Sequence, residues 1–244
     1  MTYDYESLVP GYYDFSRPGP RSRWHRAKFA TVEKIVCESA ADLLIDLGTG
    51  PGVFPRDYCK SVTNRIGFDV SRAQISYAQQ FANPQLTFIS DLSDIRNILT
   101  PQSFNGEEVS ICITALELIE HISDEALDEI FRKIEASLKS LLGSKIRINT
   151  TWIMTSPNKK SLWPLLERLI DFALGTDYHI QHSNLENNVA LAYRAQRILG
   201  VQIKRFTFLS FRQWFFGNPP LNPYRRFQFR GMLTLLVAQK VLAQ

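Results

Sequence analysis

Three glycines at alternate positions form the first candidate binding site. Gly48, Gly50 and Gly52 follow a short apolar run. Glycine lets the backbone approach a ligand closely, and a helix that begins after such a loop offers N–H groups to that ligand. The dinucleotide fingerprint would need a glycine at Val53, and the loop lacks the lysine and hydroxyl residue of a phosphate-binding Walker loop. The loop therefore predicts a ligand site of a different kind.

Two aspartates follow the next two apolar runs. Asp69 stands 17 residues after Gly52, close to the roughly 20 residues that separate a ribose-binding acid from its glycine loop. A carboxylate there can accept hydrogen bonds from both ribose hydroxyls. Asp91 follows the run that begins at Leu86. Aspartate is also a common turn residue, but the order of the two acids after the glycine loop favours ligand binding.

Glu117, Glu120 and His121 form a third candidate group. If this segment is helical, spacings of three and four residues place the three side chains on one face. Two carboxylates and an imidazole could bind Mg²⁺, Mn²⁺ or Zn²⁺, or His121 could act as a general base. A third interpretation is a turn that caps a helix beginning near Ser123. The residues alone leave all three open.

Alternating strands and helices are expected to position these groups. We predict strands over residues 43–47, 65–69, 86–91, 109–114 and 145–156, and helices over 22–38, from Ser71 to about Phe81, and from Ser123 onward. Strands that are apolar on both faces and separated by helices imply a doubly wound parallel sheet. Ligands of such sheets bind outside the carboxyl ends of the strands, where all three candidate groups lie.

The C-terminal third has a different pattern. Residues 162–174 predict an amphipathic helix and residues 188–199 a second helix, while 201–209 and 231–241 are rich in β-formers. We expect these two strands to pair antiparallel and close one edge of the sheet. The connection between them is crowded with aromatic residues, prolines and arginines, and we expect it to line a ligand pocket. Its Arg225, Arg226 and Arg230 would then meet an anionic group on the ligand.

In these motifs the sequence resembles the class I S-adenosylmethionine-dependent methyltransferases. The matching segments are residues 46–52, 67–69, 90–92 and 114–121, and their order and spacing fit across about residues 25–155. The resemblance implies a doubly wound, seven-stranded Rossmann-like methyltransferase sheet with the antiparallel C-terminal strand pair and a small helical cap. We divide the chain into an N-terminal arm or lid at 1–30, a cofactor-binding α/β core at 31–156, a helical cap at 157–200 and the strand pair at 201–244 with its insertion at 210–230.

The resemblance also implies roles for individual residues. Gly48 and Gly50 would meet the methionine part of the cofactor, Asp46 would orient its amino group, and Asp69 would bind the ribose. The implied cofactor-binding set is Asp46, Gly48, Thr49, Gly50, Gly52, Asp69, Val70, Asp91, Leu92 and Thr114, with Asp91 and the Leu92 backbone at the adenine. The methyl group is activated by the positive sulfur, so the protein mainly aligns an acceptor and takes its proton. His121 and Glu117 are the predicted catalytic residues.

The Glu-x-x-Glu-His segment is similar to segments of two methyltransferase families. These are the ubiquinone-pathway O-methyltransferases and the small-RNA 3′-terminal 2′-O-methyltransferases; in the latter the carboxylates and histidines hold a divalent metal. This similarity implies a metal-binding set of Glu117, Glu120, His121 and His179, with His182 as an alternative to His179. The RNA enzymes have a second histidine directly after the first, where this chain has Ile122.

The charge distribution bears on the partner. After Glu186 the chain has nine basic residues and no acidic one, so residues 1–186 carry −5 and the remainder +9, within a net charge of +4. Such a basic end suggests contact with phosphate, a membrane surface or another anion, or it is a solvated face. The leading prediction is O-methylation of a small or lipid-linked metabolite. RNA methylation and a noncatalytic cofactor-binding protein are the alternatives.

Two further features bear on where the protein works. No apolar run is long enough for a transmembrane helix, although peripheral membrane contact is compatible with the sequence. Cys37, Cys59 and Cys112 form no metal-binding pattern and cannot all pair, which predicts a cytoplasmic location. The oligomeric state is left open.

Overall fold

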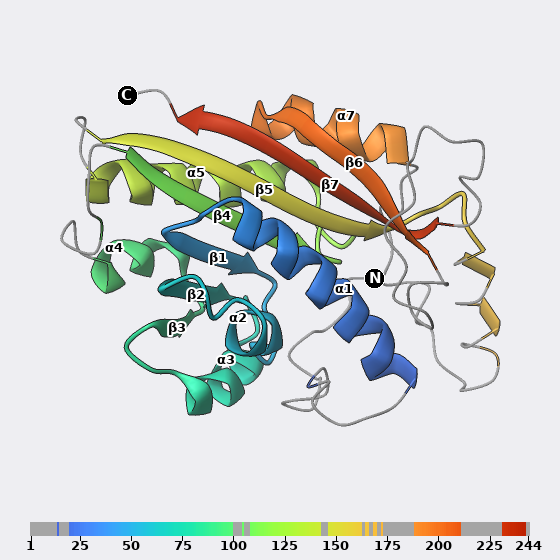
Figure 1. The fold of residues 1–244 in the computed structure, drawn as a ribbon, viewed down its shortest axis with the longest axis horizontal. Coiled ribbons are helices and arrows are strands. Elements are labelled where there is room, and N and C mark those ends of the chain that lie inside the picture. The colour runs from blue at the N-terminus through green and yellow to red at the C-terminus, as the bar shows by residue number, and fades with distance from the viewer. Residues whose placement is uncertain are drawn as a thin grey trace.

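A computed structural model describes residues 14, 20–99, 104, 108–142, 146–162, 164–165, 168–169, 172, 188–210 and 231–242 (Figure 1). Its elements in chain order are α1 (Pro20–Glu38), β1 (Leu43–Leu47), α2 (Val53–Asp57), β2 (Asn64–Phe68), α3 (Arg72–Ala78), the 3₁₀ turn η2 (Gln79–Phe81), β3 (Leu86–Ile89), the 3₁₀ turn η3 (Leu92–Asp94), α4 (Ile95–Ile98), β4 (Glu108–Leu116), α5 (Asp124–Leu142), β5 (Arg147–Pro157), α7 (Asn188–Leu199), β6 (Gln202–Ser210) and β7 (Gly231–Leu242).

The seven strands form one sheet in the order β3-β2-β1-β4-β5-β7-β6. Strands β1 to β5 are parallel to one another where they pair, whereas β7 runs antiparallel to both β5 and β6. The last strand of the chain therefore lies between β5 and β6. This topology confirms the predicted seven-stranded, doubly wound sheet with an antiparallel C-terminal pair.

Helices cover both faces of the sheet, which explains why β1, in the middle of the parallel part, has a single polar residue. All five residues of β1 are buried. Helix α1 packs on one face through side chains such as Phe29 and Val36. Helices α5 and α7 pack on the other face through side chains such as Phe131 and Leu199. Figure 1 shows α1 crossing the sheet on the side opposite α5.

The predicted helix starts at two serines are confirmed. The Ser71 hydroxyl accepts a hydrogen bond from the Gln74 N–H at 3.3 Å, and the Ser123 hydroxyl accepts one from the Ala126 N–H at 3.2 Å. An N-cap side chain of this kind satisfies one of the N–H groups that a helix leaves unpaired at its start. These caps fix where α3 and α5 begin beside the carboxyl ends of the strands.

Several expectations concern residues outside the described part of the chain. These are the insertion after Ser210, with its aromatic residues and arginines, and the histidines at 179 and 182. The predicted helix over 162–174 is described at residues 162, 164–165, 168–169 and 172, and all of these except 162 are helical. Helix α1 runs without interruption from Pro20 to Glu38, so it crosses the boundary that the sequence suggested at residue 30.

Within the described residues, no helix is both long enough and apolar enough to cross a membrane. The three cysteines are free thiols; Cys59 and Cys112 are buried and Cys37 is exposed. Burial raises the pKa of the Cys112 thiol to about 12. The buried thiols are therefore inert core residues at neutral pH.

Candidate functional site

The glycine loop connects β1 to α2 at the carboxyl edge of the sheet. Gly48, Gly50 and Gly52 all have positive φ, which side-chain-bearing residues rarely adopt. A Cβ on Gly52 would lie 2.4 Å from the ring of Phe88, so only glycine fits there. A Cβ on Gly50 would meet no atom within 4 Å. The loop is therefore packed closely on its protein side and open at Gly50, as a ligand-binding loop must be.

Asp69, directly after β2, holds this loop in place. Its Oδ2 accepts a hydrogen bond from the Gly50 N–H at 2.8 Å, and its Oδ1 accepts one from the Ser71 N–H at 2.9 Å. Each carboxylate oxygen has a second lone pair, so both could still accept from ribose hydroxyls. The next side chain, Val70, is exposed and apolar. The ligand-binding role of Asp69 stays a prediction, and nothing in the sequence indicated its bond to the loop.

Asp46 is the buried acid of the site, with 3% of its surface exposed. It lies on β1 opposite Thr114 of β4, whose hydroxyl donates to Asp46 Oδ1 at 2.6 Å. Burial raises the pKa of Asp46 to about 6, although the hydroxyls of Thr114 and Thr49 and the charge of Lys28 favour the ionised form. A cationic amino group beside Asp46 would replace the hydration that the carboxylate has lost.

The side chains of Asp91 and Leu92 differ in their exposure to solvent, and so in their accessibility to a ligand. The Asp91 carboxylate is exposed and accepts a hydrogen bond from the Ser93 N–H at 2.9 Å, which lowers its pKa. The Leu92 side chain is 2% exposed and packs in the core. A contact from Leu92 to adenine would therefore have to come from its backbone, as the resemblance implies.

Glu117 has an unusual backbone conformation directly after β4. Its φ is +57°, a value that costs a residue with a side chain of the order of 1–3 kcal/mol. Its N–H is held by both the carbonyl oxygen and the hydroxyl of Thr155, each at 3.0 Å. Its carboxylate forms an ion pair with Lys28 of α1, and His25 Nδ1 lies 3.7 Å from the same oxygen. The sequence predicted a role for Glu117 but gave no sign of Lys28.

Glu120 is buried more completely, with 1% of its surface exposed. Among the described residues, neither of its carboxyl oxygens accepts a hydrogen bond of normal geometry. Burial and the charge of Glu117 raise its pKa well above the ordinary value, and Lys28 and the Ser156 hydroxyl oppose this shift. The surroundings of Glu120 therefore favour its neutral, protonated form.

Residues 117–122 form a turn rather than a helix. The His121 N–H donates to the Leu118 carbonyl at 2.9 Å, as in a tight turn. The helical-face argument for Glu117, Glu120 and His121 therefore does not apply. Among the residues that the structure describes, no three potential metal ligands come together, and the predicted fourth ligand, His179, lies outside them.

Arg194 of α7 fixes the same turn from the far side. It is buried, and its guanidinium donates to the carbonyl oxygens of Ile119 and Ile122 at 2.8 and 2.7 Å. It also donates to Asp124 Oδ1 at 2.5 Å, where α5 begins. A planar guanidinium has donors in several fixed directions, which suits it to join three acceptors. Arg194 was expected in a basic surface, but it is a structural residue.

Other basic residues near the end of the chain also have acidic partners. Arg197 pairs with Asp124, Arg205 lies 3.7 Å from Glu38, and Lys240 lies 3.0 Å from Glu135. The arginines at positions 212, 225, 226 and 230 lie outside the described residues. Acidic side chains of the same chain therefore neutralise part of the positive charge that the sequence suggested for contact with an anionic ligand.

Asp14 belongs to the N-terminal arm and contacts two helices of the site. It accepts hydrogen bonds from the Arg56 guanidinium of α2, at 3.3 Å, and from the Tyr77 hydroxyl of α3, at 3.0 Å. These helices follow the glycine loop and Asp69, respectively. At Asp14 the arm is thus anchored beside the predicted cofactor site.

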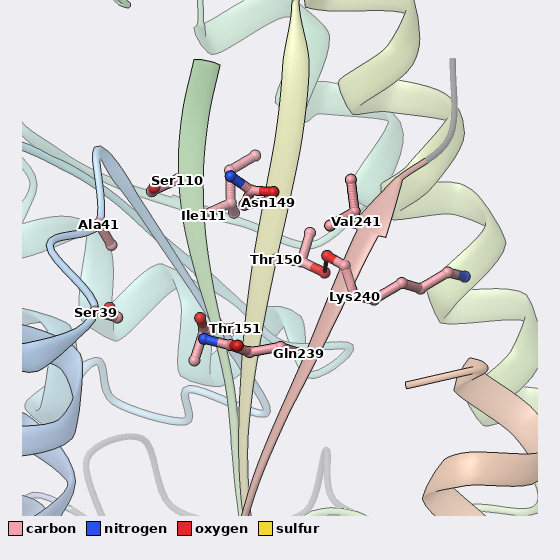
Figure 2. Close-up of a pocket in the computed structure, with 10 residues that line it drawn as sticks. All are labelled: Ser39, Ala41, Ser110, Ile111, Asn149, Thr150, Thr151, Gln239, Lys240 and Val241. Atoms are coloured by element: carbon pink, nitrogen blue, oxygen red, sulfur yellow. Dashed lines mark hydrogen bonds between the residues drawn. The ribbon is translucent and has the colours of Figure 1, made fainter. Parts of the chain in front are cut away.

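A hollow of about 310 Å³ lies near the amino ends of the parallel strands, at the opposite end from the glycine loop (Figure 2). Ser110 of β4, Asn149 of β5 and Gln239 of β7 contribute to its lining, and Ser39 borders it after α1. Ser110 and Asn149 lie near the amino ends of β4 and β5. Ligands of parallel sheets bind at the carboxyl ends, so this hollow is separate from the candidate site.

Comparison with known proteins supports one activity class. Residues 44–140 match the family model described as a methyltransferase domain. No curated protein sequence matches the chain. The matched segment begins in β1 and ends in α5, so it contains the glycine loop, Asp69, Asp91 and the turn after β4.

Solved structures with the same fold are also methyltransferases. A SAM-dependent methyltransferase from Archaeoglobus fulgidus has a TM-score of 0.56 and 17% identity, over 97% of this chain and 100% of that one. Magnesium protoporphyrin IX methyltransferase from Synechocystis PCC 6803, with bound SAH, has a TM-score of 0.54 and 17% identity, over 93% of this chain and 91% of that one. The methyltransferase domain of bacterial CtHen1-CN has a TM-score of 0.50 and 16% identity, over 88% of this chain and 99% of that one. The family match supports a methyltransferase, and the solved structures show that the fold is shared.

Proposed function

We propose that this chain transfers the methyl group of S-adenosylmethionine to an oxygen atom of a small or lipid-linked metabolite. The activity class comes from the family match, and the fold agrees with it. The acceptor class is our own addition. It is argued from the exposed apolar side chains that follow β5, beside the carboxyl ends of the strands.

The residues at the carboxyl edge fit the cofactor. The open side of Gly50 leaves room for a ligand against the loop, and the buried Asp46 carboxylate suits a cationic amino group. Asp69 retains acceptor capacity for ribose hydroxyls, and the exposed Val70 offers an apolar surface to a flat ring. When bound, the cofactor supplies a methyl group activated by positive sulfur. The remaining tasks for this chain are to place the acceptor and take its proton.

An exposed apolar face carries the acceptor proposal. Leu165, Leu169 and Phe172 are spaced by four and three residues and are between 56% and 91% exposed. Three- and four-residue spacing places these side chains on one side of a helix. The segment follows β5, and therefore begins at the edge of the sheet where acceptors bind. Such a face suits an apolar acceptor or the lipid surface that presents it.

The experiment compares two classes of acceptor. The protein is incubated with radiolabelled S-adenosylmethionine and a cell extract, and label is counted in the organic-solvent phase and in precipitated RNA. We expect label in the organic phase. Replacing Leu165, Leu169 and Phe172 together with serine should reduce it at least about tenfold while leaving cofactor affinity unchanged. Val241→Ser is the matched control, because Val241 is exposed at the other end of the sheet.

RNA methylation is the second candidate, supported by the basic residues near the end of the chain. Label in RNA that decreases steeply with salt concentration would favour it, because phosphate contacts depend on salt. The pairing of Arg194, Arg197 and Lys240 with acids of the same chain weakens this alternative. Label in neither phase, despite cofactor binding, would contradict both an apolar or lipid-linked acceptor and an RNA acceptor.

A further inference from the structure

Lys28 is a buried cation of the site. It projects from α1, is 3% exposed, and forms an ion pair with Glu117, which lies 89 residues further along the chain. Its charge also acts on Asp46 and Glu120, where it favours the ionised form of each carboxyl. The charge of Lys28 therefore acts on three acidic side chains, one from β1 and two from the turn after β4, and Lys28 contacts Glu117 directly.

The surroundings of Lys28 hold it there. Phe29, the next residue on α1, is buried and packs against Phe54 with ring centroids 5.4 Å apart. The Lys28 ammonium lies 4.9 Å from the centroid of the Phe29 ring. Because a buried charge without a partner is costly, Lys28 depends on its pairing with Glu117, whose side chain is 21% exposed. Helix α1 thus places a fixed positive charge, the Lys28 ammonium, beside Glu117 at the end of β4.

A divalent metal fits this arrangement poorly. Such an ion needs several oxygen or nitrogen ligands that converge on one point. The Glu117 carboxylate is engaged by Lys28, and no three potential ligands converge among the described residues. A metal ion bound to Glu117 would also lie against the Lys28 ammonium, and two like charges repel strongly where water is excluded. The resemblance to a metal-dependent family therefore conflicts with the packing of α1.

We propose that the ammonium group of Lys28 takes the place of a divalent metal ion beside Glu117. Lys28 is then a positioning residue, which holds the strained Glu117 at the edge where the acceptor binds. That the acceptor binds beside Glu117 rests on the proposed function, but the neutralisation of Glu117 by Lys28 does not. With Lys28 in place, the Glu117 carboxylate is neutralised by the protein itself.

The first test is a titration of the full chain with Mn²⁺ alone, after dialysis against a chelator, followed by calorimetry and elemental analysis. We expect no stoichiometric Mn²⁺ in the wild type. Although the described ligands are too few for a tight site, Lys28→Met should bind Mn²⁺ weakly through the freed Glu117 carboxylate, at least about tenfold more tightly than the wild type, because it removes the competing charge. Lys34→Met is the matched control on an exposed position of α1 and should behave as the wild type.

Further variants keep the result interpretable if Lys28→Met is unstable. Lys28→Arg retains the charge and should bind no Mn²⁺. Lys28→Met combined with Glu117→Gln removes both partners, so the double variant should be more stable than Lys28→Met alone and again bind no Mn²⁺. One Mn²⁺ per wild-type chain, lost in Glu117→Gln, would overturn the proposal. Failure to bind S-adenosylmethionine would instead contradict the proposed function and leave the Mn²⁺ titration readable.

Discussion

At the scale of single residues, the site combines acids in three different electrostatic environments. Asp91 is exposed and its pKa is lowered, Glu120 is buried and its pKa is raised, and Asp46 has a pKa of about 6. A cationic ligand group beside Asp46 favours its ionised form, so ionisation and ligand binding are coupled. Because the pKa of Asp46 is about 6, this coupling should be measurable just below neutral pH.

Cofactor affinity should increase as pH rises through about 6. Asp46 has a folded pKa of about 6 against an ordinary value of 3.8, because burial disfavours its charge. Without ligand, its contribution to folding stability is thus full below the ordinary pKa and lost as pH rises through the folded one. A bound ammonium group favours the ionised form, so the dissociation constant should increase by up to about tenfold per pH unit below the folded pKa.

Calorimetry with S-adenosylmethionine at a series of pH values on both sides of the Asp46 pKa measures this dependence. Asp46→Asn is the reference variant, since it keeps the shape but cannot ionise. The variant should bind more weakly and show a flatter pH dependence. A wild-type affinity that stays constant from acid to neutral pH would mean that Asp46 does not contact the cofactor.

Asp69→Ala should weaken S-adenosylmethionine binding and also destabilise the protein. It removes the acceptor for ribose hydroxyls and the bond that holds Gly50, and each hydrogen bond to a charged group contributes about 1.5–3 kcal/mol. Asp42→Ala is the control, because Asp42 accepts a backbone hydrogen bond from Ser110 at the other edge of the sheet. Calorimetry and chemical denaturation separate the two effects. If both variants bind the cofactor as the wild type does, Asp69 has only a structural role.

At the scale of elements, α7 supports the turn after β4 through Arg194. Arg194→Met leaves two carbonyls and Asp124 without this donor, so we expect a loss of about 2 kcal/mol or more in the free energy of unfolding. Arg197→Met is a close control, because Arg197 pairs with the same Asp124 but is 55% exposed. It should cost at most about 1 kcal/mol. Urea denaturation compares them, and equal losses would show that Arg194 does not brace the turn.

The elements themselves were largely predictable from sequence. Apolar runs marked β1 and β4, and serines followed by helical periodicity marked α3 and α5. The site was predictable only where it consists of contiguous motifs, as in the glycine loop and Asp69. Lys28 was missed because a lysine within an amphipathic helix looks solvent-exposed, and its burial depends on a carboxylate 89 residues away. The left-handed backbone of Glu117 also arises from tertiary bonds, to Thr155.

At the scale of the whole molecule, the two edges of the sheet differ in chemistry. The carboxyl edge holds the glycine loop, the buried acids and the Lys28–Glu117 pair, and the segment with the exposed apolar face begins there. The amino edge holds the hollow, lined largely by uncharged residues together with Lys240 (Figure 2). The candidate site is therefore confined to one edge, as expected for an open parallel sheet.

The central claim is that the carboxyl edge binds S-adenosylmethionine. The most direct measurement is isothermal calorimetry of the wild-type chain with S-adenosylmethionine, S-adenosylhomocysteine and NADH in parallel. We expect saturable binding of the first two at one site per chain, and none of the third, because the glycine loop lacks the dinucleotide spacing. A folded protein that binds NADH, or that binds neither sulfur compound, would contradict the claim.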